Sequence, residues 1–419
     1  MNVQNFLQQT GCLSEDWPQW FLDLYERTRL EWMDTPIPHK SDEMWRFGHP
    51  SMLHVAENIP YPELPDDELE DMVRSLPPAS ATSYRIVVIN GRLIGEPCVL
   101  PDGLMVQSLG EYIRTEPTAQ VSLETPFESL GMRRFVLLRC LLGGEGLVIR
   151  TRPNIVVDKP IEIIHLVAGD RTLIAPMTLI APGENARVDI LEHHWGVDHG
   201  ESVILSVQHL LLASGSSVRY ALLQQLNEHS RAIELADAVL GANAQLEHLS
   251  VHQGALWSRQ ELMCRLEGRG AQAQLLSAAS LDGSRELDQR TYQQHSCPGT
   301  RSNLLYKNVL NDSSKSTFSG MIRVDSGAHE TDSYQSNLNL LMSERAEANS
   351  MPGLEILADG VQCSHGTAVS PIDPEQIFYL QSRGIPLSTA KKMIATGFLK
   401  QPMELFTCNE ITELLKAKL

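Results

Sequence analysis

Hydrophobic and polar positions alternate along four similar segments in the middle of the chain: APGENARVDIL, ASGSSVRYALL, LGANAQLEHL and EGRGAQAQLLS. Each segment has a glycine, then an alanine or valine three positions later, then alternating positions that would face inward in an extended chain. The glycines are Gly183, Gly215, Gly241 and Gly268, with spacings of 32, 26 and 27 residues. A turn and a short strand that recur at such a period are typical of a β-solenoid, in which each coil lays a strand on the previous one.

An antiparallel β-sandwich with glycine turns is the alternative, because it also contains many short strands. Sandwich hairpins, however, usually place turns every ~8–12 residues. The longer repeat therefore favours a mainly β protein built as a parallel β-helix.

The pattern of hydrophobic and polar residues changes near residues 83 and 370, which divides the chain into three regions. Residues 1–82 are expected to be helical, with one helix in SEDWPQWFLDLYERTRLEWM, capped by Ser14, and another in PDDELEDMVRSL. Residues 83–370 are expected to form the β-helix core, and SYRIVVINGRLI at its start predicts a hairpin with an Asn-Gly turn. Residues 371–419 are expected to be helical again.

Three helices are predicted in the C-terminal region. The first lies in DPEQIFYLQSRG, with Asp373 as its N-cap, Pro374 in its first turn and Gly384 after its end. The second begins with Ser388 or Thr389 as its cap and ends at Gly397. The segment NEITELLKAKL forms the third.

Composition narrows the function classes. The chain has 419 residues, 42% hydrophobic and 21% charged, which is an ordinary globular balance. The formal net charge of −18 argues against binding to nucleic acid or to an anionic membrane. The sequence begins without the pattern of an export signal, and its seven cysteines are scattered without a C-x-x-C motif, so a reduced, cytoplasmic protein is expected. The sequence contains no phosphate-binding loop and no hydrolase motif, and no enzyme activity is predicted.

Cys363 and His365, in DGVQCSHG, are the main candidates for chemistry. Two positions apart on a strand, their side chains point to the same side, with Ser364 on the other. A thiolate and an imidazole can bind iron, but a stable metal site needs three or four ligands, and no neighbouring residue supplies the others. The pair is therefore either a structural cysteine with a hydrogen-bonded histidine or half of a site that a partner chain completes.

Two other groups contain histidines. His193, His194 and His199 lie close together in LEHHWGVDHG, but adjacent histidines on a strand point to opposite faces, so these three are not expected to surround one metal ion. Their role stays open. His295 and Cys297, in YQQHSCPG, precede a Pro-Gly turn and are interpreted as structural.

Several blocks in the last third of the chain resemble the SufB/SufD family of iron–sulfur cluster assembly proteins. They are YKNVLNDSSKSTFSGMIRV, SNLNLLMSERAEANSMPGLEILADGVQCSHGTAVSPID and QIFYLQSRGI, in the family's order. Near the N-terminus, KSDEMWRF resembles the family's short acidic Trp-Arg block. SufB-like chains usually carry a cysteine where this chain has Leu380, and they lack CSHG, so the chain is most similar to the SufD-like branch.

The resemblance implies a right-handed parallel β-helix between helical ends and a non-enzymatic subunit of an assembly complex. It implies that a SufB-like subunit pairs with the edge of the β-helix and that a SufC-like ABC ATPase docks on the C-terminal helices. A transient iron ion or Fe–S cluster is expected at the SufB interface, with Cys363 and His365 as shared ligands and no cofactor tightly bound by the isolated chain. The expected docking residues for the ATPase are Phe378, Tyr379, Arg383, Lys391, Lys392, Ile394 and Phe398.

Two alternatives stay open at this point. One is a SufB-type scaffold that holds the cluster alone, and the other is a β-helix enzyme that acts on carbohydrates. The enzyme would need clustered carboxylates, which are sparse here. The sequence does not decide whether the isolated chain forms a homodimer or whether the complex binds a flavin.

Overall fold

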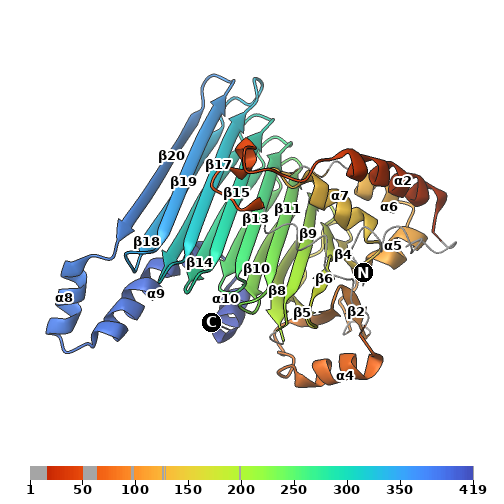
Figure 1. The fold of residues 1–419 in the computed structure, drawn as a ribbon. Coiled ribbons are helices and arrows are strands. Elements are labelled where there is room, and N and C mark those ends of the chain that lie inside the picture. The colour runs from red at the N-terminus through yellow and green to blue at the C-terminus, as the bar shows by residue number, and fades with distance from the viewer. Residues whose placement is uncertain are drawn as a thin grey trace.

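The protein winds two facing β-sheets into one elongated β-solenoid with helices at both ends (Figure 1). The computed structural model describes residues 17–50, 64–95, 99–124, 127, 129–197 and 200–418. From β8 onward, successive strands alternate between the sheets, and from β9 onward each strand pairs in parallel with the strand two before it. The predicted parallel β-helix is therefore confirmed, and the sandwich is excluded.

Sheet 1 contains, in spatial order, β2 (Arg92–Ile94), β1 (Tyr84–Ile89), β5 (Ile161–Val167), β8 (Arg187–Gly196), β10 (Ser217–Gln225), β12 (Gln245–His252), β14 (Gln272–Leu281), β16 (Arg301–Leu310), β18 (Asp332–Leu341) and β20 (Gln362–Pro371). Sheet 2 contains β3 (Leu104–Ser108), β4 (Gly146–Thr151), β7 (Met177–Ala181), β9 (Ser202–Leu212), β11 (Arg231–Leu240), β13 (Trp257–Leu266), β15 (Glu286–His295), β17 (Lys315–Val324) and β19 (Glu347–Ile356). The short strand β6 (Thr172–Ile174) pairs with β9.

The strands of the predicted repeat lie side by side, but the Gly215 segment is shifted by two residues relative to the other three. Val188, Val218, Leu246 and Ala273 occupy neighbouring positions on β8, β10, β12 and β14, and all four are buried. These are the positions that the alternation in the sequence assigns to the interior. Each coil therefore buries its apolar row against the same row of the coils before and after it.

The N-terminal end of the solenoid is covered by helices. α2 (Gln19–Asp34) packs its aromatic residues against α7 (Arg133–Leu141), and α4 (Asp66–Ser75) places Leu69 against β1 and β5. α2 begins after Pro18, and the predicted cap Ser14 lies outside the described residues. The predicted Asn-Gly hairpin is present, with β1 antiparallel to β2 and both turn residues, Asn90 and Gly91, at positive φ.

Three helices interrupt the β structure after this hairpin. They are α5 (Leu109–Thr115), α6 (Ala119–Glu124) and α7. The regular stack of coils therefore begins later than the sequence pattern at residue 83 suggests. A 3₁₀ turn, η1 (Glu43–Trp45), lies in the segment between α2 and α4.

The C-terminal region forms α8 (Pro374–Ser382), α9 (Leu387–Leu405) and α10 (Asn409–Lys418). Asp373 accepts a hydrogen bond from the Glu375 amide, as predicted for the N-cap of α8. The predicted second helix is wrong at both ends: α9 begins after Pro386 and continues through Gly397 to Leu405. Beyond Gly397, Phe398 and Leu399 pack on the solenoid, and that burial outweighs the ~1 kcal/mol propensity cost of a helical glycine.

Glycines at the corners allow the coils to stack closely. A methyl group added at Gly183 would come within 2.7 Å of the Pro153 nitrogen, and one added at Gly241 within 3.0 Å of the Leu212 carbonyl oxygen. At Gly268 it would overlap the backbone of Gly241 and Ala242. The repeated glycines are thus required by the close approach of one coil to the next.

Replacing Gly268 by alanine is expected to lower the free energy of unfolding by roughly 3 kcal/mol, because overpacking a filled site forces the backbone to shift. Gly327 is the matched control, since an added Cβ there has no heavy atom within 4 Å. Denaturant unfolding of the Gly268→Ala and Gly327→Ala variants measures the difference. Equal stabilities of the two variants would contradict the stacking argument.

Candidate functional site

The two ends of the solenoid differ. At the N-terminal end, β2 and β3 lie antiparallel to their neighbours and terminate the two sheets. At the other end, β20 pairs only with β18, and β19 only with β17, within the described part of the chain. The last coil therefore presents two strand edges with free backbone hydrogen-bonding groups, which we call the open edge, formed by β19 and β20.

Cys363 and His365 lie on β20, at this open edge. Their neighbours on β18 are Ser333 and Gln335, which are buried in the solenoid, whereas Ser364 lies beside the exposed Tyr334. The two side chains therefore share the inner face of the last coil. Cys363 is half-buried, and His365 is exposed.

The thiol of Cys363 is not activated in the isolated chain. Partial burial raises its pKa, and the nearby carboxylate of Asp332 raises it further. Among the described residues, one group of three potential metal ligands lies close together, and it includes neither Cys363 nor His365. The pair offers a protonated thiol and one imidazole, which is less than a metal site needs.

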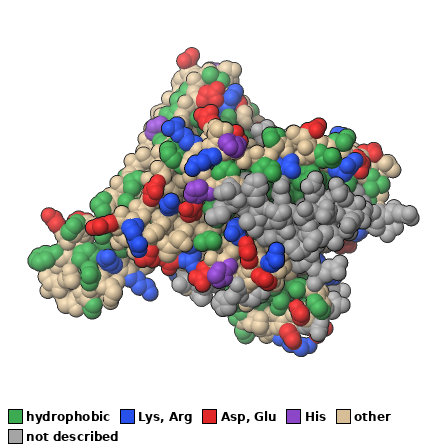
Figure 2. All heavy atoms as spheres, in the orientation of Figure 1, with side chains coloured by type: hydrophobic (Ala, Val, Ile, Leu, Met, Phe, Trp, Pro, Cys, Tyr) green, Lys and Arg blue, Asp and Glu red, His purple; other side chains and the backbone are tan. Residues whose placement is uncertain are grey.

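The helix α8 projects from the solenoid beside the open edge, and hydrophobic side chains gather on this projecting end (Figures 1 and 2). Phe378 and Tyr379 are 74% and 56% exposed, far more than rings of this size usually are. The Arg383 guanidinium lies 5.0 Å from the centroid of the Tyr379 ring. We call these three residues of α8 and its C-cap the α8 patch.

The other predicted docking residues are on α9. Ile394 and Phe398 pack with Val309 and Leu340 of the solenoid, and the Lys307 ammonium lies 4.4 Å from the centroid of the Phe398 ring. These two apolar residues therefore attach α9 to the solenoid. Lys392 is exposed and Lys391 is half-exposed.

The chain beyond α9 is part of the core. Phe406, Cys408, Ile411 and Leu415 are buried against residues of β8, β10, β12 and β14. Arg219 of β10 donates a hydrogen bond to the Thr407 carbonyl oxygen. The C-terminal region is thus divided between an exposed α8 and an α10 that covers sheet 1.

The segment 40–50, which contains the KSDEMWRF block, lies across sheet 2 as a strap. Its Trp45 is 1% exposed, stacks on Trp257 at 6.4 Å between ring centroids, and lies 3.9 Å from the guanidinium of Arg259. Arg259 is itself buried and forms ion pairs with Glu261 and Asp288. The sequence block therefore has a structural role in closing sheet 2.

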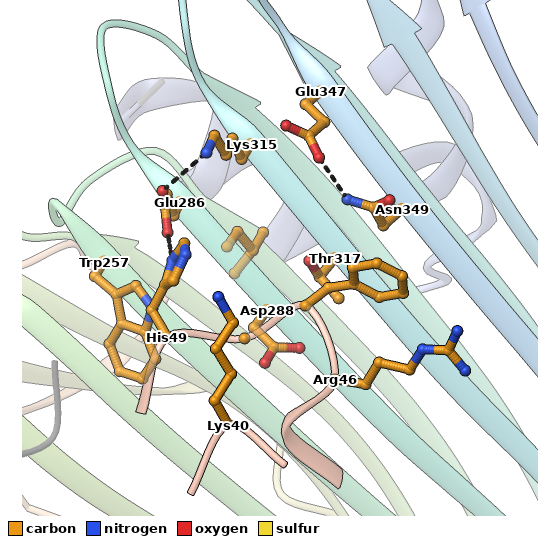
Figure 3. A pocket seen from close by; sticks show the side chains of 13 residues that line it. Lys40, Arg46, His49, Trp257, Glu286, Asp288, Lys315, Thr317, Glu347 and Asn349 are labelled. Carbon is orange, nitrogen blue, oxygen red and sulfur yellow. Dashed lines mark hydrogen bonds and ion pairs between the residues drawn. The ribbon is translucent and has the colours of Figure 1, made fainter. Parts of the chain in front are cut away.

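A hollow of about 360 Å³ remains beside the strap (Figure 3). Charged side chains of both signs line it. His49 contacts Glu286, and the Lys315 ammonium lies 3.8 Å from the same carboxylate. Because these charges compensate one another, the hollow has no single sign that would select a ligand.

The remaining histidines occupy buried positions. His295 is fully buried, and its two ring nitrogens lie 2.8 and 2.9 Å from the hydroxyls of Thr300 and Ser302. The Cys297 thiol contacts the Glu267 carbonyl oxygen. Both residues thus have structural contacts, and burial lowers the pKa of His295 from 6.5 to about 4.

His193 and His194 point to opposite sides of β8, while His199 lies outside the described residues. The His193 Nε2 lies 3.0 Å from the Gln225 amide oxygen. His194 instead joins Glu192 of its own strand and His165 of β5 in the interior. We call His165, Glu192 and His194 the His–Glu cluster.

The His–Glu cluster was not found from the sequence because one member comes from another coil. Glu192 and His194 are two apart on a strand, and His165 is the neighbour of His194 in the parallel register. Burial alone would lower the pKa of His194, but Glu192 and Glu234 raise it to about 9. Burial alone would raise the pKa of Glu192, but the adjacent imidazoles hold it well below its ordinary value.

Fold and site define a β-solenoid protein with an open edge at one end and a projecting helix beside it. Residues 165–398 match the family model for the SUF system FeS cluster assembly, SufBD core domain. This span is more than half of the chain, so the chain belongs to the SufB/SufD family.

Individual relatives agree with this membership. The chain is 25% identical to an iron–sulfur cluster assembly SufBD family protein of Synechocystis, over 86% of this chain and 82% of the relative. It is 29% identical to the iron–sulfur cluster assembly protein SufD of Escherichia coli over 59% of each chain. It is 23% identical to SufB of Bacillus subtilis, over 95% of this chain and 88% of the relative. No helix among the described residues is long and apolar enough to cross a membrane.

The buried His295 is expected to make the protein sensitive to acid. In the unfolded chain the imidazole takes up a proton near pH 6.5, whereas in the folded chain it does so only near pH 4. The contribution of His295 to the free energy of unfolding is therefore fully present above pH 6.5, and it is lost as the pH decreases toward 4. For His295 this loss amounts to up to roughly 3 kcal/mol.

Urea unfolding of the wild type and of His295→Asn at several pH values tests this expectation. The stability difference between the two proteins should shrink as the pH falls from 7 to 4. A difference that stays constant over this range would show that His295 does not titrate with the predicted shift.

Proposed function

We propose that this chain is the SufD-like, non-catalytic subunit of a cytoplasmic iron–sulfur cluster assembly complex. The open edge carries the proposal. Solenoids need a terminal cap to stay soluble, and a last coil without one is a template for pairing with another chain. The family membership and the similarity to both SufD and SufB relatives support this reading.

The proposed partner at the open edge is a SufB-like subunit. Such a subunit belongs to the same family, so strands of its own solenoid are suited to continue sheets 1 and 2 by strand addition. All side chains of β19 and β20 are half-exposed or exposed in the isolated chain, which leaves the edge accessible. Self-pairing of two copies of this chain is the competing occupant of the same edge.

The proposed chemistry at this interface is the transient binding of iron or a nascent Fe–S cluster. The iron or cluster is the substrate of assembly and not a resident cofactor of the chain. Cys363 and His365 supply one thiol and one imidazole from the inner face of the last coil, and the partner supplies the remaining ligands. A bound iron ion displaces the thiol proton, which the raised pKa otherwise retains. His365 is exposed and therefore accessible to the partner's side of the interface.

The proposed partner at the α8 patch is a SufC-like ABC ATPase. Two exposed aromatic rings beside an arginine have the composition of an interface centre, where aromatic residues and arginine are enriched. Lys391 and Lys392 belong to the polar rim of this surface. Ile394 and Phe398 support it from beneath by fixing α9 to the solenoid.

Replacing Phe378 and Tyr379 by serine is expected to weaken ATPase binding at least ~100-fold, because interface aromatics carry much of the binding free energy. The matched control is Val156→Ser, which removes another exposed apolar side chain, 69% exposed, from a position far along the chain. Co-purification and titration calorimetry with the SufC-like protein measure the effect. Unchanged affinity of the double variant would rule out the α8 patch.

Point variants are preferable to deletion of the C-terminal region. A truncation after Ser370 removes Phe406, Ile411 and Leu415 along with α8, and these residues are part of the core. Such a truncation would therefore expose the core of sheet 1, and the double variant is the better test. Pairing with the SufB-like subunit serves as its folding control.

The variants Cys363→Ser and His365→Ala are each expected to form the complete complex but to assemble clusters more slowly, with the larger loss for His365→Ala. Neither change opens a large cavity, since Cys363 is only half-buried and His365 is exposed. Ser364→Ala on the outer face is the matched control. The measurement is iron and acid-labile sulfide per complex over time under anaerobic conditions.

Two outcomes would contradict this proposal. Normal assembly rates in both variants would show that the pair is only structural. A stoichiometric cluster on the isolated chain after anaerobic reconstitution would instead favour a SufB-type scaffold that acts alone.

A further inference from the structure

The His–Glu cluster lies deep inside the first coils of the solenoid, far along the chain from Cys363 and His365. His165 is 2% exposed, and Glu192 and His194 are fully buried. The Nε2 atoms of His165 and His194 lie 3.2 and 3.1 Å from the same carboxylate oxygen, Glu192 Oε1. The two imidazole planes are nearly perpendicular, at 86°. Two nitrogens and one oxygen thus come together within 4.8 Å of one another in the interior of the solenoid.

Hydrogen bonding alone does not account for this arrangement. His165 Nε2 shares Glu192 Oε1 with His194 Nε2 and Gln208 Nε2, and among the described residues His165 Nδ1 has no hydrogen-bond partner. A carboxylate oxygen shared by three donors and a buried imidazole nitrogen without a partner are both costly, and such groups need an explanation. A metal ion at the centre of the three ligand atoms would replace the shared contact at Glu192 Oε1 by a bond to His165 Nε2, with the proton of His165 on Nδ1.

We propose that His165, Glu192 and His194 bind a divalent first-row transition metal ion that is resident in the solenoid. In a tetrahedral site with metal–ligand bonds of about 2.0–2.1 Å, neighbouring ligand atoms lie roughly 3.3 Å apart. Two of the three separations, 3.2 and 3.1 Å from the imidazole nitrogens to Glu192 Oε1, are close to that value, and all three ligand atoms lie within 4.8 Å of one another. Two imidazoles and one carboxylate are ligands that suit zinc and iron(II), and a water molecule would complete the four positions.

The surroundings have the features of an outer coordination shell. His194 Nδ1 lies 3.0 Å from Glu234 Oε1, which fixes the tautomer that directs the Nε2 lone pair inward. Tyr220 donates a hydrogen bond of 2.8 Å to the second oxygen of Glu192. Gln208 donates a longer one, 3.4 Å, to Oε1. A divalent cation also balances the two buried carboxylates, Glu192 and Glu234.

The proposed ion would act as a structural clamp. Its ligands come from β5 and β8, and Glu234 of β11 adds a strand of the opposite sheet. The ion would therefore tie both sheets together near the start of the regular coils. Because the ligands are buried, the ion has to enter while the coils close, which couples metal binding to folding. This role is independent of cluster assembly at the open edge.

The experiment uses the full chain with its affinity tag removed. Elemental analysis after dialysis against a chelator is expected to find about one zinc or iron per chain. The chain is then unfolded with chelator and refolded with Zn²⁺, with Fe²⁺ under anaerobic conditions, or without metal. The favoured ion should raise the melting temperature by about 5 °C or more, and refolding with Co²⁺ should give the visible bands of a tetrahedral nitrogen–oxygen site.

Variants locate the site. His165→Ala and Glu192→Gln should reduce bound metal to near zero and remove the melting shift. His193→Ala changes the next residue of the same strand on its other side and should keep the ion. His365→Ala and Cys363→Ser should also keep it, which separates this site from the open edge.

Three results would overturn the proposal. One is a purified chain without stoichiometric metal whose melting temperature none of the ions changes. In that case His194 is an imidazolium between two carboxylates. Another is metal that persists in both His165→Ala and Glu192→Gln. The third is metal that is lost in His365→Ala instead. If the core variants do not fold, the refolding and Co²⁺ measurements on the wild type decide alone.

Discussion

In-register parallel pairing of successive coils is the constraint on which the rest of the molecule depends. Because every strand lies beside the same position of the coil before it, one row of side chains is repeated along the whole sheet. The row that contains Val188 and Val218 becomes apolar core, and the glycine corners are required because the same rows approach closely. This pairing stops at the last coil, because no further coil follows it, so its strand edges stay free within the described chain. Core, corners and open edge are thus three consequences of one pairing rule.

The same rule concentrates polar residues in the interior. His165, His194, Gln224 and His252 form one row on neighbouring strands of sheet 1. The facing strand of sheet 2 contributes Glu234, whose carboxylate meets His194. A polar row buried at this depth has to be satisfied by its own members or by a bound ion. A slip of one residue would move every group of the row to the other face of the sheet, so these polar contacts also specify the register.

Features set by local sequence could be predicted, and features set by distant residues could not. The alternation around Gly268, the Asn90 turn and the Asp373 cap depend on a few adjacent residues, and the structure has all three. The end of α9 depends on packing against the solenoid, which Gly397 does not reveal. The role of Trp45 depends on Arg259, more than two hundred residues away in the chain. The candidate sites differ in the same way. Cys363 and His365 are two positions apart on one strand and could be predicted as a pair. His165 lies beside His194 only because of the register between coils, which the sequence does not show.

The open edge and the α8 patch belong to one packed unit. Strand β20 continues directly into α8 through Ile372, which packs with Val309 and Leu340 of the preceding strands. α9 lies against β14 and β16, and α10 then crosses sheet 1 as far as β8. A protein bound at α8 would therefore be attached to the same body that holds Cys363 and His365. The two proposed partners, one at the strand edge and one at the helical arm, would be coupled through well-packed contacts rather than through a flexible linker. The coupling follows because α9 and α10 are fixed to the solenoid by buried contacts.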